Sequence, residues 1–561
     1  MKYLIIGGVA GGASTAARLR RLDEQAEIIL FEKGSYISYA NCGLPYYIGD
    51  VITDRNQLFV SNATTFKERF NIEARVLSEV MAIHPDTKSV EVRNLKTGEL
   101  YAESYDKLVL SPGAEPIRPP LEGINSEGIF TLRNVTDTDK IKAYVSQFQG
   151  GKAVVIGAGF IGLEMAENLH HLGMKVTIVE MGDQVLAPTD FPIAALAQRH
   201  IRSKGVDLRL KTAVTGFERN EDGLKVLLKE EAPLDADVVI LSIGVRPDTR
   251  LAVAAGLKLG SAKGILVNEY LQTSDPDIYA VGDAIEFINP ITGNSMSTYL
   301  AGPANKQGRI CANNIVLGNK NSYNGAINTA IVKVFDQTVA VAGVASKHLK
   351  AANIPHLVST THSGSHAGYY PGSEQLSIQI VFSPEDGKLL GAQIIGVEGV
   401  DKRIDMLSSV IKRGSTIYEL TEFEHAYAPP YSSAKDPVNM AGFVAENIIQ
   451  KRLQVVPWST TSQIGMEDIL LDVRTEKEYC NGSIKGAINI PVDTLRDRLE
   501  DLPKDATIYI YCQIGLRGYL AQRILLQSGF ANVFNLSGGY KLWEACDAEK
   551  RLLENSGLVA Q

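Results

Sequence analysis

Residues 3–12 read YLIIGGVAGG, and residues 153–162 read AVVIGAGFIG. Each stretch is a short apolar run that ends in glycines, and a helix-forming segment follows it, to about Arg21 in the first case and about His171 in the second. Short apolar runs bounded by glycine are typical of buried parallel strands, and the helix that follows completes a crossover. The two stretches therefore predict two α/β domains with parallel sheets on one chain.

The glycine spacing indicates what these two units bind. In a dinucleotide fold, glycines permit a tight turn and let the backbone approach a pyrophosphate at a helix N-terminus. The second unit has the full Gly-x-Gly-x-x-Gly pattern at Gly157, Gly159 and Gly162. The first unit keeps Gly7 and Gly12 but has a valine at the middle position. Both units are therefore predicted to be Rossmann-like dinucleotide-binding domains.

An acidic residue follows each unit at the distance this fold uses for ribose binding. Glu32 lies 20 positions after Gly12, and Glu180 lies 18 positions after Gly162. A carboxylate at this position accepts hydrogen bonds from ribose hydroxyls. Because it disfavours a 2′-phosphate, we expect NADH at the second unit, with NADPH as the alternative. Two dinucleotide sites on one chain predict FAD and a nicotinamide acting in series.

Cys42 lies in the run SYANCGLP, residues 38–45, shortly after the first unit. A thiol there suggests electron exchange with a flavin ring. No cysteine occurs in residues 43–47 to close an internal disulfide, so the partner sulfur must come from a substrate, a cofactor or another part of the chain. Attack on a disulfide or persulfide needs the thiolate, which cations and helix N-termini favour. Although a free cysteine is commonly a small buried apolar residue, we expect Cys42 to be redox active.

Cys512 is a second candidate thiol. It follows an expected strand at residues 507–511 and opens a loop that runs to Gly518. Such a loop points successive amides inward and forms a nest for a thiolate or persulfide anion. Arg517 adds a cation, and Gln513 and Gly515 complete the loop. Two separated thiol sites make sulfur chemistry the leading expectation.

Composition excludes several classes of protein. The chain has 561 residues and a net charge of −8, which argues against a nucleic-acid binder. Five cysteines, an odd number, fit a reducing compartment rather than a disulfide framework. No apolar run approaches the roughly 20 residues of a membrane span, and the N-terminus enters a strand at once, with no signal peptide expected. We expect a cytoplasmic α/β enzyme without a metal site.

Residues 1 to about 450 resemble the single-cysteine branch of the flavoprotein disulfide reductases, in particular coenzyme A-disulfide reductases. The resemblance rests on Ser38, Asn41 and Cys42, on the stretch 273–283, which is similar to the family's second FAD motif, and on tyrosine motifs at 366–372 and 426–436. It implies that Asp283 contacts the ribityl and phosphate region of the flavin. It also implies a homodimer, in which Tyr369 and Tyr427 reach the partner subunit's cysteine and stabilise a leaving thiolate.

The same resemblance implies contacts with coenzyme A. Arg18 and Arg21 are three positions apart on the first helix, so they share one face and could clamp phosphates. The family often places a lysine after Phe66, where this chain has Lys67 and Arg69, and which of the two meets the nucleotide stays open. The implied contacts are Ser14, Arg18, Arg21, Ser38, Asn41, Asn305 and Lys435.

The C-terminal hundred residues resemble rhodanese (sulfurtransferase) domains. The match covers the active loop from Cys512 to Gly518 and the stretches 471–475, 486–491 and 536–540. One departure is Ser483, where many rhodaneses carry a histidine. The remaining cysteines lack such settings and are expected to be structural: Cys311, Cys480 and Cys546.

These expectations give a domain plan. The expected ranges are an FAD-binding domain at 1–112 and 243–325, an NAD(P)H-binding domain at 113–242, an α+β interface (dimerisation) domain at 326–452, a linker at 453–462 and a rhodanese α/β domain at 463–561.

The resulting interpretation is an FAD-dependent NADH oxidoreductase that reduces a sulfur substrate at Cys42, with Cys512 carrying sulfane sulfur and CoA as ligand or carrier thiol. CoA persulfide, CoA disulfide, glutathione persulfide and polysulfide are not ranked by the sequence. Three alternatives remain. The chain could be an NADH oxidase or peroxidase that cycles Cys42 through a sulfenic acid. It could be a plain CoA-disulfide reductase with an accessory rhodanese, or its rhodanese could be a non-catalytic sensor or docking module.

Overall fold

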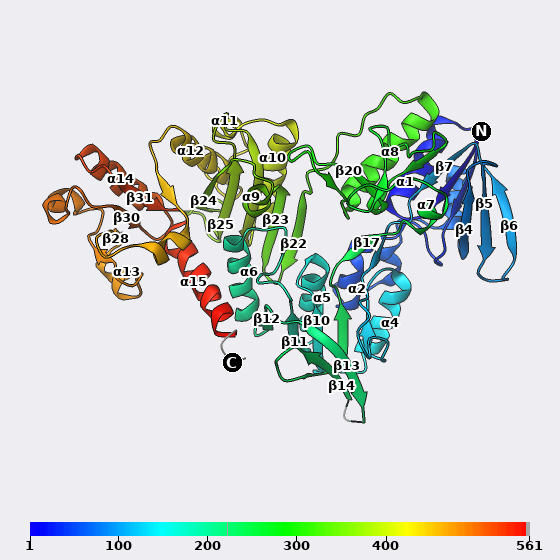
Figure 1. Cartoon of the computed structure of the whole chain (residues 1–561), viewed down its shortest axis with the longest axis horizontal. Helices are drawn as coiled ribbons and strands as arrows, with labels where there is room; N and C mark the ends of the chain where they lie inside the picture. Colours follow the sequence, from blue (N-terminus) through cyan, green and yellow to red (C-terminus); the bar gives the residue numbers. More distant parts are fainter. Residues whose placement is uncertain (222, 557–561) are drawn as a thin grey trace. The chain divides into compact units, whose positions relative to one another are not determined.

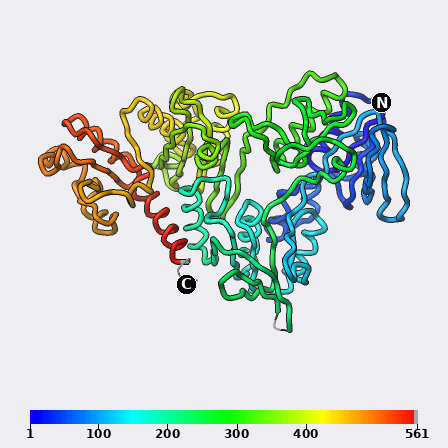
Figure 2. The backbone as a smooth tube through the Cα atoms, in the orientation of Figure 1, coloured from blue at the N-terminus to red at the C-terminus, as the bar shows by residue number. Residues whose placement is uncertain are grey.

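The structure is a computed structural model that describes residues 1–221 and 223–556. These residues form two compact units. Unit 1 comprises residues 1–179 and 213–328, and unit 2 comprises residues 180–212 and the chain from 329 onward. In the chain traces, unit 1 has a blue-to-cyan segment and a green segment, and unit 2 extends to the red C-terminal helix (Figures 1 and 2).

The first sheet of unit 1 is parallel and has the order β19-β7-β1-β2-β3. Its central residues, such as Leu4, Ile5, Leu30 and Val109, are fully buried, as expected for a sheet covered on both faces. Strand β1 leads through the first glycine turn into α1, as the sequence predicted. The elements are β1 (Lys2–Ile6), α1 (Ala10–Leu22), β2 (Glu27–Phe31), β3 (Glu73–Arg75), β7 (Lys107–Leu110) and β19 (Ile278–Ala280).

The second sheet of unit 1 repeats this plan. Its parallel strands run in the order β11-β10-β16-β9, and α5 begins directly after the second glycine turn and ends at His171, where the sequence predicted it. The elements are β9 (Ile129–Phe130), α4 (Val135–Val145), β10 (Lys152–Ile156), α5 (Phe160–His171), β11 (Lys175–Val179) and β16 (Val238–Leu241).

Smaller elements surround the two sheets of unit 1. The short helices near Cys42 are η1 (Asn41–Gly43), α2 (Leu44–Ile48), η2 (Arg55–Leu58) and α3 (Ala63–Phe70). The small sheets are formed by β4 (Ser78–His84), β5 (Ser89–Asn94), β6 (Leu100–Ser104), β8 (Ala114–Pro116), β13 (Val214–Asn220), β14 (Gly223–Leu228), β15 (Leu234–Ala236), β17 (Val245–Pro247), β18 (Ile265–Leu266), β20 (Ile285–Ile288) and β21 (Ser295–Met296). The remaining helices are α7 (Arg250–Ala254), η3 (Gly282–Ala284) and α8 (Ala301–Leu317).

Unit 2 contains an antiparallel sheet in the order β22-β23-β26-β25-β24. Strand β26 is buried along its whole length because helices pack on the sheet, among them α10 and α12 (Figure 1). Its strands are β22 (Ala330–Val334), β23 (Gln337–Gly343), β24 (Leu357–Gly364), β25 (Gln375–Phe382) and β26 (Leu389–Gly396). The other elements of this part are α6 (Phe191–Ser203), β12 (Asp207–Arg209), α9 (Ser346–Ala351), α10 (Val400–Arg413), α11 (Ile417–Glu422) and α12 (Pro437–Ile449).

The C-terminal part of unit 2 has its own parallel sheet in the order β27-β31-β30-β28-β29. The stretch 453–462, expected as a linker, supplies β27, and Trp458 stacks on Phe191 of α6 with ring centroids 5.7 Å apart. The last five residues of the range expected for this domain, 557–561, lie outside the described residues. The elements are β27 (Val455–Val456), η4 (Trp458–Gln463), β28 (Ile469–Asp472), α13 (Glu476–Cys480), β29 (Ile488–Asn489), η5 (Leu495–Asp501), β30 (Ile508–Tyr511), α14 (Leu516–Gln527), β31 (Val533–Leu536) and α15 (Gly539–Ser556).

The predicted mixed α/β architecture is confirmed. It has two Rossmann-like parallel sheets, an antiparallel sheet and a separate parallel sheet in the C-terminal part. In the described part of the chain, no helix combines the length and the apolar character needed to cross a membrane.

Candidate active site

A cavity of about 590 Å³ lies in unit 1 beside the first glycine turn, within the usual size range of ligand sites. Gly7 has φ +99°, and a Cβ there would lie 2.0 Å from the Ser111 carbonyl oxygen, so only glycine fits. At Gly12 a Cβ would lie 1.9 Å from the Gly7 carbonyl oxygen. The Glu32 carboxylate accepts a hydrogen bond of 2.9 Å from the Gly8 amide. Of the predicted residues, Gly7 and Glu32 line this cavity, and Gly12 packs against the backbone of Gly7.

Asp283 and Arg133 give the cavity its electrostatic character. Asp283 lies in η3 on the cavity wall, where burial raises its pKa to about 6 against the opposing effect of the Arg133 guanidinium. The Arg133 Nε is buried and has no hydrogen-bond partner among the described residues. An unpaired buried donor costs about 1–3 kcal/mol, so this wall fits an acceptor-rich ligand such as a dinucleotide. Arg133 was not among the residues predicted from the sequence.

The second glycine turn has the same geometry as the first. Gly157 has φ +101°, and a Cβ there would lie 2.4 Å from the Ser242 carbonyl oxygen. A Cβ at Gly162 would lie 2.0 Å from the Gly157 carbonyl oxygen, whereas Gly159 has open space around it. Glu180 directly follows β11, and its carboxylate accepts a hydrogen bond of 2.7 Å from the Gly182 amide. The backbone of this turn is therefore shaped for the close approach of a pyrophosphate.

Cys42 is an exposed thiol in η1, directly before α2. Partial desolvation of the thiol by the surrounding protein, and then the carboxylates of Glu164 and Asp283, raise its pKa. The charged groups that shift this thiol's pKa are therefore carboxylates, which disfavour the thiolate.

Tyr46 and Glu164 form a pair beside Cys42 that sequence reasoning missed. Tyr46 lies one helical turn after Cys42, and its hydroxyl donates to Glu164 Oε1 at 3.3 Å. Burial raises the pKa of Glu164 to about 7, with the Tyr46 hydrogen bond opposing this shift. A carboxyl group with such a pKa can hold or release a proton at neutral pH. Tyr46 could have been found by its spacing from Cys42, but Glu164 could not.

The residues implied for CoA binding lie in several places. Arg18 donates to Asn313 Oδ1 at 2.9 Å, and desolvation together with the neighbouring Arg309 and Arg21 guanidinium groups lowers its pKa. These three arginines form an electropositive cluster in unit 1, of which Arg309 was not predicted. In the same unit the Ser14 hydroxyl donates to Asn305 Oδ1, Asn41 lines the 590 Å³ cavity, and Ser38 has φ +49°.

Unit 2 brings the two predicted tyrosines together. The hydroxyls of Tyr369 and Tyr427 are 2.8 Å apart, and this hydrogen bond raises the pKa of Tyr369. Both side chains are exposed, at 76% and 46%. Tyr427 and Lys435 also line a second cavity of about 440 Å³. The two hydroxyls are therefore accessible from the surface and can form hydrogen bonds with an external group.

Cys512 lies buried at the carboxyl end of β30. Its Sγ accepts a hydrogen bond of 3.1 Å from the Gly515 amide, and Gly515 is the N-cap of α14. A Cβ at Gly518 would lie 2.2 Å from Asn535 Oδ1, so the helix can approach β31 only with glycine there. The sulfur therefore sits at a helix N-terminus, a setting that favours a thiolate or persulfide anion.

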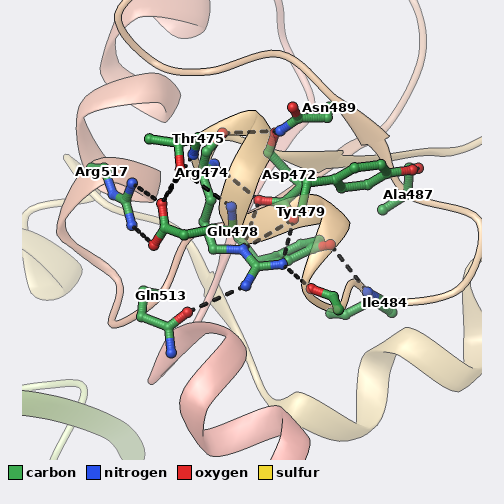
Figure 3. Close-up of polar contacts among 12 residues, drawn as sticks. Asp472, Arg474, Thr475, Glu478, Tyr479, Ile484, Ala487, Asn489, Gln513 and Arg517 are labelled. Carbon is green, nitrogen blue, oxygen red and sulfur yellow. Dashed lines mark hydrogen bonds and ion pairs between the residues drawn. The ribbon is translucent and has the colours of Figure 1, made fainter.

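Arg517 does not act as an isolated cation near this loop. Its two terminal nitrogens each donate to a Glu478 carboxylate oxygen at 2.7 Å (Figure 3). The Arg517 guanidinium holds the pKa of Glu478 at about 2. Arg474, which makes a buried ion pair with Asp472, donates to Gln513 Oε1 at 3.3 Å. Arg517 is thus paired with Glu478 and also interacts with the Cys512 side chain, and Arg474 contacts the loop through Gln513.

The other cysteines differ in exposure. Cys311 and Cys546 are buried, and burial raises both pKa values, whereas Cys480 is exposed at the end of α13. Among residues 1–221 and 223–556, no cluster of three or more His, Cys, Asp or Glu side chains is placed to hold a metal ion.

Comparisons with known proteins cover almost the whole chain. Residues 1–308 match the pyridine nucleotide-disulphide oxidoreductase family, residues 329–437 match the dimerisation domain of that family, and residues 460–546 match the rhodanese-like domain. The coenzyme A disulfide reductase of Staphylococcus haemolyticus is 37% identical over 448 residues, which is 80% of this chain and 100% of that protein.

Two solved structures are similar over nearly the full length. Reduced CoADR-RHD from Bacillus anthracis is 48% identical, with a TM-score of 0.95 and coverage of 98% of both chains. A NAD-dependent persulfide reductase from A. fulgidus is 38% identical, with a TM-score of 0.91 and coverage of 97% of this chain and 100% of that one. The resemblance to coenzyme A-disulfide reductases and to rhodaneses, expected from the motifs, is confirmed.

Proposed function

Because the chain belongs to the pyridine nucleotide-disulphide oxidoreductase family of FAD- and NAD(H)-dependent oxidoreductases, we propose that it passes electrons from NADH to a CoA-linked persulfide, polysulfide or disulfide at Cys42. Cys512 of the rhodanese domain carries sulfane sulfur in this proposal. It rests on one observation above all: two thiols have complementary settings, with Cys42 exposed and electrostatically coupled to Asp283 of the dinucleotide cavity and Cys512 held in an anion-stabilising loop.

The proposed domains follow the expected ranges. Residues 1–112 with 243–325 bind FAD, residues 113–242 bind NADH, residues 326–452 form the dimer interface, residues 453–462 connect, and the chain from 463 forms the rhodanese. Gly7, Gly12, Glu32 and Asp283 hold the flavin nucleotide, and Gly157, Gly159, Gly162 and Glu180 hold the nicotinamide nucleotide. When bound, FAD supplies a carrier that accepts two electrons from NADH and makes them available to sulfur.

The thiol chemistry at Cys42 takes two steps. The Cys42 thiolate attacks a sulfur of the substrate, a mixed disulfide forms, and sulfide or a thiol leaves. Two electrons that originate from NADH and one proton then cleave the mixed disulfide, which restores the thiolate and releases the second thiol. Glu164, with a pKa of about 7, is suited to hold that proton beside the sulfur.

Substrate binding falls to the positions that the resemblance implies. The cluster of Arg18, Arg21 and Arg309 is suited to CoA phosphates because guanidinium groups bind phosphate through paired hydrogen bonds. Ser14, Ser38, Asn41, Asn305 and Lys435 complete the proposed CoA contacts.

In a homodimer, the tyrosine pair of one subunit would serve the cysteine of the other subunit. Tyr369 and Tyr427 share a hydrogen bond and are exposed, so a partner subunit's Cys42 can approach them. A hydroxyl that already accepts a hydrogen bond from a second one is a better donor to a leaving thiolate.

The proposal is tested by anaerobic turnover with NADH, comparing CoA persulfide with CoA disulfide while sulfide release is recorded. Cys42→Ser is expected to lose sulfur reduction but keep reduction of the flavin by NADH. Cys480→Ser, which removes another exposed thiol, serves as the control and should match the wild type. Persistent sulfur reduction in Cys42→Ser, or turnover only with oxygen or peroxide, would contradict the proposal and favour an oxidase.

The role of Cys512 is tested with two sulfur donors. Cys512→Ser is expected to lose activity with polysulfide but to keep activity with soluble CoA persulfide, which reaches Cys42 directly. Loss with neither donor would make the rhodanese domain an accessory.

A further inference from the structure

The antiparallel sheet of unit 2 contacts the rhodanese at the turn that follows β31. Strand β24 is the edge strand of that sheet, so its outward backbone groups and side chains are available to a neighbour. The Thr360 amide donates to Ser537 Oγ at 3.2 Å, and a ring nitrogen of His362 lies 3.0 Å from the Gly538 carbonyl oxygen. Lys541 donates to Gln375 Oε1 of the next strand.

The hydrogen bonds of His362 fix the state of its ring. Its side chain is buried, and burial together with the nearby Lys541 ammonium lowers its pKa to about 3, so the ring is neutral at physiological pH. Because the Gly538 carbonyl can only accept, Nε2 must carry the proton. Nδ1 is then the acceptor for the hydroxyl of Ser377, 2.8 Å away on β25. The Gly538 carbonyl therefore sets the tautomer of His362, and the Ser377 hydroxyl supports it by donating to Nδ1.

The turn that His362 contacts is hydrogen bonded, through the start of α15, to the backbone of the Cys512 loop. Gly538 and Gly539 have φ +74° and +61°, and α15 begins at Gly539. From the first turn of α15, the Tyr540 amide donates to the Cys512 carbonyl oxygen at 2.8 Å, and the Lys541 amide donates to the Gln513 carbonyl oxygen at 3.1 Å. A Cβ at Gly539 would lie 2.6 Å from the Cys512 carbonyl oxygen, so the start of α15 packs directly against the backbone of Cys512.

We propose that His362 of the dimerisation domain is a positioning residue for sulfur transfer at Cys512. Its Nε2–H fixes the Gly538 carbonyl, the turn fixes the start of α15, and α15 fixes the two carbonyls at the start of the active loop. With those carbonyls fixed, the Gly515 amide stays aimed at the sulfur. The inference rests on the proposed function of Cys512, and it makes the rhodanese dependent on a residue outside its own domain.

Thiosulfate and cyanide are suitable probes because their sulfur transfer balances without an oxidant. The Cys512 thiolate attacks the outer sulfur of thiosulfate, a bond forms between the two sulfurs, and sulfite leaves. Cyanide then takes the outer sulfur of the Cys512 persulfide as thiocyanate, and the thiolate is restored.

The experiment compares four variants of the full-length holoenzyme. His362→Phe removes the donor but keeps a ring, and His362→Gln places an amide N–H at about the same reach. Ser377→Ala removes the hydroxyl that donates to Nδ1 and supports this tautomer. His356→Phe is the matched control, because its ring likewise bonds a serine, Ser346, in the same domain. The readouts are kcat and KM for thiosulfate and hydrogen exchange of the peptide 512–518.

We expect His362→Phe to lower kcat about five- to tenfold, the effect of losing one buried hydrogen bond, with KM within twofold and faster exchange of the loop. His362→Gln should recover most of the lost kcat. The kcat of Ser377→Ala should lie between those of His362→Phe and the wild type, and His356→Phe should match the wild type. Wild-type kcat and exchange in His362→Phe, or equal loss in the Phe and Gln variants, would overturn the inference.

Failure of the proposed function gives a different result. The wild type itself would then transfer no sulfur through Cys512, yet the exchange comparison would still report whether His362 holds the loop.

Discussion

The pairing of Arg517 with Glu478 allows a prediction of its energy and of its pH dependence. Glu478→Gln removes the charge but keeps an oxygen that can accept from Thr475, so the helix cap of α13 survives. The Glu478 pKa falls from 4.5 to about 2, which corresponds to an upper bound of about 3.4 kcal/mol at 1.36 kcal/mol per unit. Both side chains are nearly one-third exposed, at 31% and 32%, and solvent screening reduces this to about 1–1.5 kcal/mol.

The assay is hydrogen exchange of the peptide 475–481, which reports local opening of α13. At pH 7 the Glu478→Gln variant should exchange about five- to tenfold faster than the wild type. Because the native pKa is depressed, the stabilisation is fully present above the unfolded value near 4.5 and is lost progressively as pH falls from there through about 2. The ratio between variant and wild type should therefore be the same at pH 6 and pH 8.

Glu476→Gln is the matched control on the same helix and should change exchange by less than about twofold, since surface substitutions away from paired groups have small effects. Exchange of Glu478→Gln within twofold of the wild type would refute the reasoning. It would mean that the ion pair contributes no stability to α13.

Three further predictions concern the reductase half. Glu164→Gln should lower the pKa of Cys42, because a carboxylate that raises it is removed. Iodoacetamide should therefore alkylate Cys42 faster at pH 7. Unchanged or slower alkylation would show that Glu164 does not govern this thiol. Tyr427→Phe should lower sulfur-substrate kcat by roughly 10²-fold, the scale of one lost acid or oxyanion donor, whereas Tyr431→Phe, in the same motif, should not; equal rates for both would make Tyr427 a packing residue. The wild type should have a higher kcat/KM with NADH than with NADPH. Glu180→Ala should reduce the ratio of the two kcat/KM values, since the carboxylate repels a 2′-phosphate. A wild-type preference for NADPH would contradict this.

Features that depend on neighbouring residues in the chain were predictable from the sequence. The two glycine turns, the strands before them and the helices after them follow from local sterics, because a Cβ at Gly12 or Gly162 would collide with the carbonyl oxygen of the glycine five residues earlier. The Cys512 loop was equally readable, since the Gly515 amide that reaches its sulfur is three residues away. Cys42 stood out through its spacing from the first turn and the lack of a second thiol.

Tertiary structure alone decided what surrounds these groups. Glu164 and Asp283 come to Cys42 from distant parts of the chain and raise the thiol's pKa, and no local pattern predicted them there. Arg517 was predicted as a cation at the Cys512 loop, but its ion pair with Glu478, 39 positions earlier, was not. His362 and Gly538 are 176 positions apart. Periodicity and spacing describe which face of an element is buried, but they hold no information about which two faces meet. Electrostatic and hydrogen-bond partners therefore had to come from the packed fold.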